Sequence, residues 1–193
     1  MSLKQVLLAA VVGLAGCTAS TKTTLAGEAD QPGFSAEIRR TAYGVPHIKA
    51  DDFGGIGYGF GYASAEDNIC EIMDRMMTVT ATRAKHLGAG DKDVNVLSDV
   101  YHQRAIQGGE AEKLLAGPAG SPDTPSADAR AIAKGYVAGI NRYLRETGAA
   151  GITDPRCKGQ PWVREIREID FWRHMFVGQT IDSFIAPTTE AAP

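Results

Sequence analysis

The chain has 193 residues and a formal net charge of -3 at pH 7, and 44% of its residues are hydrophobic. This length and composition suit one globular unit with its own core, or part of a larger one. No basic stripe is visible, so the composition argues against nucleic acid as a partner. Beyond the N-terminus, no apolar run approaches the roughly 18 to 20 residues that span a bilayer.

Residues 1–16 have the pattern of an export signal. Lys4 precedes the apolar run VLLAAVVGL, which is too short to span a membrane and predicts a signal peptide. The segment LAGC resembles a bacterial lipobox, which would place a lipid on Cys17; an incidental cysteine behind an ordinary signal peptide is the alternative. We therefore expect a periplasmic or outer-membrane lipoprotein that touches the membrane only through its lipid anchor. Residues 17–33 are small and polar and predict a flexible tether.

The remaining cysteines predict a disulfide. If Cys17 carries a lipid, Cys70 and Cys157 are left in an oxidising compartment, where a bridge between them is the economical interpretation. Two buried free thiols are the alternative. No CxxC pair or Cys/His spacing indicates zinc.

The first elements expected in the globular part are two strands. Phe34, Ala36 and Ile38 alternate with polar residues, which predicts a half-buried strand. TAYG then predicts a turn and VPHIKA a returning extended segment. Pro46 cannot donate to a ladder, so it belongs at an edge or at a strand start. The pattern predicts a short hairpin.

The rest of the chain has helical periodicity. In the second expected helix, Leu97, Val100 and Tyr101 share one face. The last helix is apolar nearly all round, which predicts deep burial. Two strands are a poor sheet alone and need partners that this chain does not supply. The expected fold is α+β, a short hairpin followed mostly by helices. The helices run from Tyr62 to Gly88, over residues 94–106, from the N-cap Ser126 to Gly148, and from the N-cap Asp170 to about Phe184.

The stretch at residues 42–68, which is rich in glycine from residue 54 onward, allows three interpretations. Its glycines fit neither a GxGxxG fingerprint nor a P-loop, which argues against nucleotide binding. His47 as a general base oriented by Asp67 would need a nucleophile, but no GxSxG elbow surrounds Ser64. A structural histidine bonded to the backbone is the better interpretation. Glu66 and Asp67 are favoured at a helix start by the helix dipole. The glycines allow another backbone to approach closely at a strand-to-helix connection.

The segment RRTAYGVPHIKADDFGGIGYGFGYASAEDNIC resembles the start of the α chain of the penicillin acylase family of N-terminal-nucleophile hydrolases. Asn68, where penicillin G acylases usually carry Arg, favours the acyl-homoserine lactone and aculeacin A acylase branch. GYVAGINRYL and FWRHMFVGQTIDSF resemble two later helices, the second of which lines the family's acyl pocket. The matching motif residues, which we assign to the fold and to interchain docking, are Gly44, Pro46, His47, Gly59, Gly61, Tyr62, Glu66 and Asp67.

The resemblance implies an αββα sandwich made by a precursor that cuts itself into a small α and a large β chain. The N-terminal Ser of the β chain would be nucleophile and, through its α-amine, base. Residues 34–193 would be an α-chain region truncated before the β chain, incomplete and inactive alone, with no catalytic residue. The implied partners are a β subunit, from the same precursor or an adjacent gene, and a small N-acyl amide: an acyl-homoserine lactone, a lipopeptide or a β-lactam amine. The alternatives are a non-catalytic envelope lipoprotein used for binding or assembly, and an inactive gene fragment.

The resemblance also places substrate contacts on the last helix. Pocket positions that carry Met and Arg in penicillin G acylases fall at Thr180 and Ser183, which would open the pocket for a longer acyl chain. The family's calcium-binding Glu falls at Glu190, but one carboxylate is far short of the 6 to 8 oxygens of a calcium shell. No cofactor is therefore expected, and calcium is a weak candidate. The expected acyl-pocket residues are Phe176, Thr180, Ile181 and Phe184, the last of which core packing would equally explain.

Overall fold

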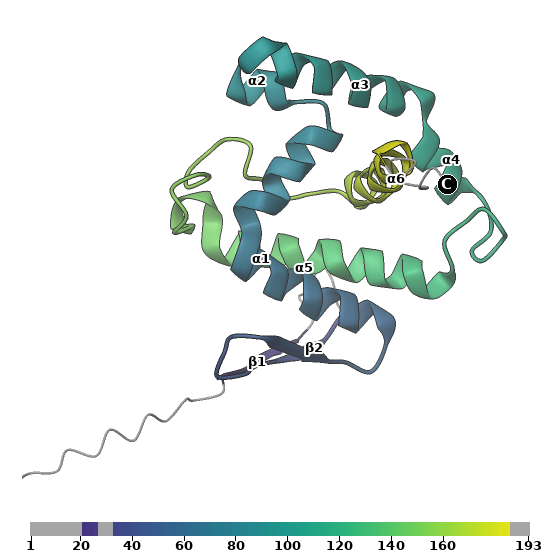
Figure 1. The fold of residues 1–193 in the computed structure, drawn as a ribbon. Coiled ribbons are helices and arrows are strands. Elements are labelled where there is room, and N and C mark those ends of the chain that lie inside the picture. The colour runs from purple at the N-terminus through teal and green to yellow at the C-terminus, as the bar shows by residue number, and fades with distance from the viewer. Residues whose placement is uncertain (1–20, 27–32, 186–193) are drawn as a thin grey trace, which may run out of the picture.

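The computed structural model describes residues 21–26 and 33–185, with side chains up to Phe176. Cys17, Glu190 and the predicted signal peptide lie outside the described residues. Figure 1 shows a small sheet on one side of a mostly helical body. The elements are β1 (Thr21–Leu25), β2 (Ala36–Arg40), β3 (Pro46–Lys49), α1 (Phe53–Val79), α2 (Arg83–Leu87), the 3-10 turn η1 (Asp91–Asp93), α3 (Val94–Gly108), α4 (Glu110–Ala116), α5 (Ala127–Gly151) and α6 (Glu168–Ile185).

The sheet is antiparallel in the order β1-β2-β3. The predicted β2–β3 hairpin is confirmed, with Ile38 paired opposite Ile48. The prediction of a flexible tether is wrong over Thr21–Leu25, because this segment pairs with all of β2. Its threonines favour extended backbone, and Leu25 is buried against α1 and α5 residues, so the segment has an apolar anchor.

The glycine-rich stretch forms the first half of α1 and is not a connection between a strand and a helix. The helix begins after Asp52, whose carboxylate accepts a hydrogen bond from the Gly55 amide at 2.7 Å. Glycines four residues apart share one helical face. Gly55 and Gly59 therefore face the sheet, while Gly57 and Gly61 face α5. Close packing on both faces outweighs the low helix propensity of glycine.

The crossing of α1 and α5 is a contact between two backbones. A Cβ atom placed on Gly61 would lie 2.1 Å from the Tyr136 carbonyl oxygen of α5. On α5 itself, a Cβ on Gly139 would lie 2.1 Å from the Tyr58 carbonyl oxygen, and one on Gly135 would clash with Gly54. The expectation that the glycine-rich stretch admits a neighbouring backbone is confirmed at Gly57 and Gly61, whereas the sequence does not predict it for Gly135 and Gly139.

The main core lies beside this crossing, between α1, α5 and the loop that follows α5. It contains the predicted Cys70–Cys157 disulfide, which joins α1 to that loop across 87 residues of sequence. Cys157 is fully buried. The buried apolar residues of this core include Met73, Met76, Met77, Ile140, Leu144, Trp162 and Val163.

The first predicted helix differs from the structure at both ends, since α1 already begins at Phe53. The expected helix from Tyr62 to Gly88 is two helices, because α1 ends at Val79 and Gly88 caps α2 instead. The break is stabilised by Thr80, whose hydroxyl donates to the Met76 carbonyl at 2.7 Å.

The next two predicted helices are confirmed, α3 spanning Val94–Gly108 and α5 starting at Ala127. Ser126 caps α5 by accepting a hydrogen bond from the Ala129 amide at 3.1 Å. The expected stop at Gly148 is an interruption inside α5, where this glycine takes a φ of 64°.

Candidate functional site

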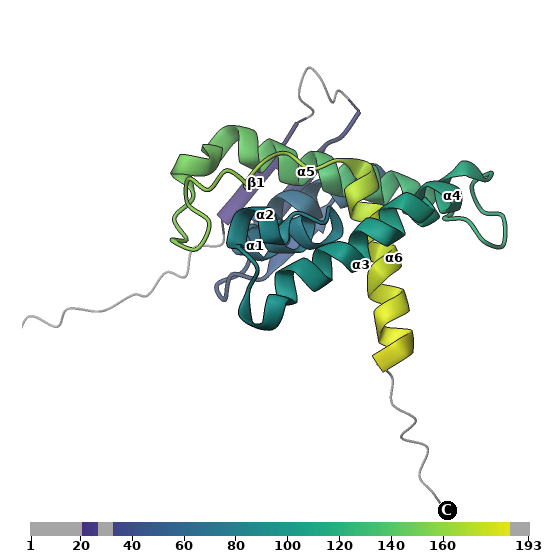
Figure 2. The same cartoon turned by 90° about the horizontal axis from the view of Figure 1, so that it is seen from above.

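Helix α6 carries all four predicted acyl-pocket positions. Phe176, Thr180 and Phe184 are spaced by four residues and therefore share one face of the helix. Figure 2 shows that α6 crosses α3 and points its C-terminal end away from α5. The side chains of Thr180, Ile181 and Phe184 lie outside the described residues, so their role as pocket lining stays a prediction.

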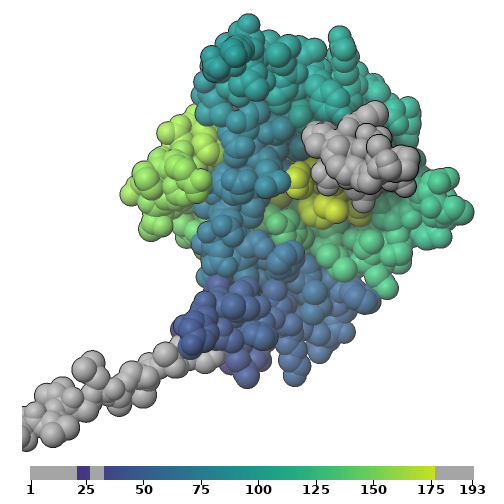
Figure 3. Space-filling model, in the orientation of Figure 1, coloured from purple at the N-terminus to yellow at the C-terminus, as the bar shows by residue number. Residues whose placement is uncertain are grey.

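The described part of α6 is not buried on all sides. Trp172 is buried, whereas Met175 is 42% exposed. Figure 3 shows yellow atoms of α6 at the surface between α1 and α5. The other described elements cover only part of the α6 surface, so burial of this helix against the implied β chain stays a prediction.

The N-terminal turn of α6 is held by a buried carboxylate. Asp170, 1% exposed, accepts hydrogen bonds from the Arg167 side chain at 2.8 and 3.0 Å and from its amide at 3.3 Å. The prediction of Asp170 as the N-cap is wrong, because α6 begins at Glu168 and Asp170 reaches back from the first turn, as in a capping box. Arg173 also pairs with Asp170, at 3.4 Å, and with Glu112 of α4. The first turn of α6 is thereby locked to α4.

Phe176 lies at the wall of a small cavity between α3, α4 and α6. Its lining also includes His102, Glu110 and Arg173, and its volume is about 10 Å³, the size of one water molecule. The His102 Nδ1 lies 2.8 Å from the Ser98 carbonyl oxygen, which fixes the ring. A cavity of this size cannot hold an acyl chain, so an acyl pocket at Phe176 would need walls beyond those described.

Arg40 connects the hairpin to α1. Its guanidinium donates to the Gly44 carbonyl at 2.9 Å and lies 2.9 Å from Glu66 and 3.0 Å from Asp67. Burial alone would lower the pKa of Arg40, but bonds to the two carboxylates raise it. The expectation that Glu66 and Asp67 start a helix is wrong, because they lie inside α1, just before its kink at Asn68. They serve instead as the acceptors of Arg40.

His47 does not have the expected structural role. Pro46 starts β3 as predicted, and His47 follows on the outer face of the sheet, exposed beside Arg39. Ile48, the next residue, faces α1 at Gly59. His47 therefore points away from α1 and from Asp67, so the structure does not bring the considered general base and its orienter together.

Tyr62 belongs to a polar cluster that joins α1 to α5. Its hydroxyl donates to Glu146 at 2.8 Å, and Arg142 donates to Glu146 at 2.7 Å and to the buried Tyr58 hydroxyl at 2.9 Å. Burial favours a higher pKa for Glu146, but the hydrogen bonds from Arg142 and Tyr62 outweigh it and lower the pKa. The cluster also reaches the sheet, because Arg142 donates to the Ala26 carbonyl at 2.6 Å.

Arg40, Arg142 and Arg173 are the residues that sequence reasoning missed. Each joins elements far apart in the sequence, and the only signal for Arg40 is the acidic pair 26 and 27 residues downstream. Within residues 21–26 and 33–185, no three His, Cys, Asp or Glu side chains gather as a metal site. No helix in the described part of the chain is long and apolar enough to cross a membrane.

The arrangement of a small antiparallel sheet under two crossed helices is the fold of a solved penicillin acylase. A thermostable penicillin G acylase from Alcaligenes faecalis superimposes with a TM-score of 0.58 and 24% identity, over 89% of this chain and 78% of that chain. This likeness concerns the fold alone. The penicillin amidase family model matches residues 35–173, and the chain therefore belongs to the penicillin amidase family.

Curated relatives agree with the predicted branch of the family. Aculeacin-A acylase from Actinoplanes utahensis is 40% identical over 190 residues, which cover 94% of this chain and 24% of that protein. An acyl-homoserine lactone acylase from Pseudomonas fluorescens is 34% identical over 82% of this chain and 20% of its own length. A penicillin acylase from a Pseudomonas species is 26% identical. The chain thus spans about a quarter or less of the curated relatives it matches.

Proposed function

We propose that this chain is the α-subunit portion of an exported amidohydrolase that removes an acyl group from a linear amide. One observation carries the proposal: the chain matches 78% of a solved penicillin acylase chain but only 24% of aculeacin-A acylase. A unit of this size corresponds to a separate small chain within a much longer family polypeptide. The completed enzyme would be an αββα sandwich to which β1, β2 and β3 contribute one edge.

In this proposal the chemistry belongs to a partner β chain. The hydroxyl of its N-terminal Ser attacks the amide carbonyl while its own α-amine accepts the proton. The amine leaves, and water then hydrolyses the acyl ester to release the acid. Helix α6 supplies part of the acyl-pocket wall through Phe176, Thr180, Ile181 and Phe184. No cofactor is required.

The proposed substrates are N-acyl amides with a long acyl chain, such as an acyl-homoserine lactone or a lipopeptide. Two relatives are named as acylases of aculeacin A and of acyl-homoserine lactones, and they are more similar to this chain than the penicillin acylases reported above. The small side chains at Thr180 and Ser183 support a roomy pocket.

A functional test is to co-express this chain with the part of aculeacin-A acylase outside the matched residues. Acid release is measured from homoserine lactones with acyl chains of graded length. We expect turnover that requires both chains and is lost when the partner's N-terminal Ser is changed to Ala. A complex without turnover would favour the non-catalytic assembly module instead.

We also propose that Cys17 carries a lipid that holds the enzyme at the outer membrane, on the periplasmic side. The test is membrane fractionation combined with mass spectrometry of the N-terminal peptide. The Cys17→Ala variant should move to the soluble periplasmic fraction. Equal membrane association of both forms would reject the anchor.

A further inference from the structure

Helix α3 exposes its apolar side and buries polar residues. Val94, Leu97, Val100 and Tyr101 are all exposed, and Leu97 is 64% exposed. They fall on one face by helical spacing, which we call the α3 apolar face. The opposite side carries Asn95 and His102, and His102 is only 5% exposed. The predicted amphipathic helix is therefore confirmed in its pattern, but it is turned away from the core of this chain.

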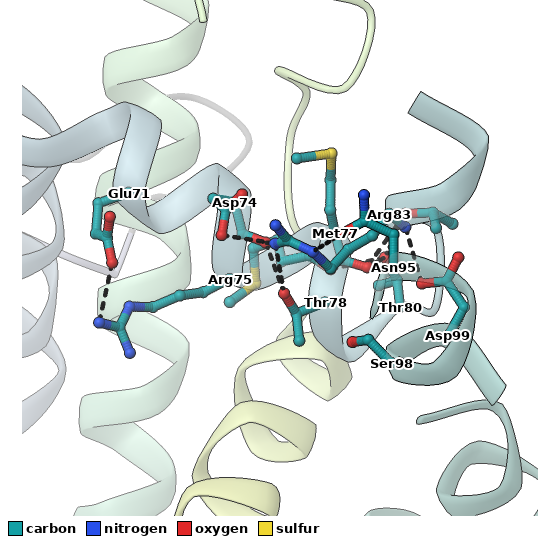
Figure 4. A network of polar contacts seen from close by, with 12 residues as sticks. Glu71, Asp74, Arg75, Met77, Thr78, Thr80, Arg83, Asn95, Ser98 and Asp99 are labelled. Carbon is teal, nitrogen blue, oxygen red and sulfur yellow. Dashed lines mark hydrogen bonds and ion pairs between the residues drawn. The ribbon is translucent and has the colours of Figure 1, made fainter. Parts of the chain in front are cut away.

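This orientation is held by a polar network (Figure 4). Arg83 donates from Nε to the Asn95 side-chain oxygen at 3.1 Å and from Nη1 to Asp74 of α1 at 2.7 Å. Asp99 of α3 accepts the Arg83 and Ala84 amides at 2.9 and 2.8 Å and so caps the start of α2. Rolling α3 to bury its apolar face would break these bonds, so the exposed orientation is built into the fold.

A positive charge, that of Arg104, lies next to the α3 apolar face. Arg104 lies three and four residues after Tyr101 and Val100, so it continues the same face for one more turn. It is exposed and has no ion pair within the described part of the chain. A surface that covers this face would therefore be apolar, and it would carry a carboxylate at the position that faces Arg104.

We propose that the α3 apolar face is a docking surface for the β chain, specifically for an apolar segment that carries an Asp or Glu opposite Arg104. This inference rests on the proposed function. A β chain is the expected occupant, because at least three quarters of aculeacin-A acylase lies outside the region that matches this chain. A contiguous exposed apolar face also indicates an interaction site when it is held rigidly.

The test compares two variants with the same charge change on the same helix. Leu97→Glu alters the α3 apolar face, and Gln103→Glu alters an exposed polar position. Each is co-expressed with the rest of the Actinoplanes utahensis acylase, and affinity is measured on the purified complex. We expect Leu97→Glu to weaken assembly at least about tenfold, and Gln103→Glu to change it less than about twofold. Neither should lower the melting temperature of the chain alone, since both side chains are exposed.

Three results would overturn the proposal. If Leu97→Glu assembles as the unaltered chain does, the docking surface is elsewhere while the proposed function stands. If the chain self-associates through this face and Leu97→Glu abolishes only that, the occupant is a second copy. If the unaltered chain forms no complex at all, the proposed function fails and the docking proposal fails with it. Charge reversal by Arg104→Glu should also weaken assembly, whereas equal binding would reject the acidic partner residue.

Discussion

The crossing of α1 and α5 leaves no space for a methyl group, and Gly139→Ala tests this directly. The added Cβ would lie 2.1 Å from the Tyr58 carbonyl oxygen and 2.7 Å from the Tyr62 amide nitrogen. Both atoms belong to backbone, so no rotamer change relieves the clash. Because real Cβ atoms essentially never come within 3.0 Å of such atoms, α1 and α5 must separate by about 1 Å.

The expected cost follows from that separation. A gap of about 0.5 to 1 Å forfeits a quarter to a half of each dispersion contact along the crossing. Overpacking of this kind lowers the free energy of unfolding by about 1 to 3 kcal/mol, whereas the higher helix propensity of alanine raises it by about 1 kcal/mol. Since the crossing also involves Gly57, Gly61 and Gly135, we expect a net loss near the upper end, about 2 kcal/mol. For a chain of this size that lowers Tm by roughly 4 to 8 °C.

The assay is thermal unfolding followed by circular dichroism. Gly151→Ala is the matched control, because it makes the same change on the same helix, and its Cβ would meet only the Thr147 side chain, at 3.3 Å. The control should leave Tm within about 2 °C. A Gly139→Ala melting temperature at or above that of the unaltered chain would show that the two backbones are not in close contact at this position.

Three further predictions concern the polar contacts and the disulfide. Arg40→Met should lower the free energy of unfolding by about 1 to 2 kcal/mol in urea titrations and speed hydrogen exchange in the β2–β3 hairpin; unchanged exchange would mean that the clamp on Glu66 and Asp67 is not formed. Cys70→Ser should cost about 2 to 4 kcal/mol, and added reductant should then have no further effect, whereas it should destabilise the unaltered chain. Burial, and secondarily Arg75, lower the pKa of His174. As the pH falls, His174 is protonated at a higher pH in the unfolded chain than in the folded chain. The free energy of unfolding should therefore decrease as the pH drops below about 6.5. His174→Gln should show a smaller fall between about pH 7 and 5.5, and an equal fall would assign it to other groups.

Elements with local signals were predictable from the sequence. The β2–β3 hairpin follows from alternating burial and a turn, and α5 follows from a Ser126 cap and a regular apolar stripe. The disulfide follows from the cysteine count together with the prediction of export. Each of these depends on residues close in sequence or on composition alone.

The remaining features depend on tertiary contacts that no local pattern contains. The first half of α1 has poor helix propensity and is helical because Gly57 and Gly61 fit against α5. The α3 periodicity predicts an apolar face but not that this face points away from the core of the chain. The same limit applies to the site. Helical spacing predicts that Phe176 lies on a helix, which α6 confirms, but it does not predict the Asp170–Arg173–Glu112 contacts, which join α4 to α6 across 61 residues of sequence.

Helix α6 is attached to α4 by an ion pair near its N-terminal end. Its 18 residues correspond to about 27 Å, and the ion pairs of its described side chains, which end at Phe176, lie at Asp170 and Arg173. A tilt of about 5° at the N-terminal end would move the far end by about 2 Å, more than the length of one carbon–carbon bond. In the proposed enzyme, Glu112 on α4 would then affect the preferred acyl-chain length without lining the pocket. A substitution in this ion pair would change selectivity without changing a pocket residue.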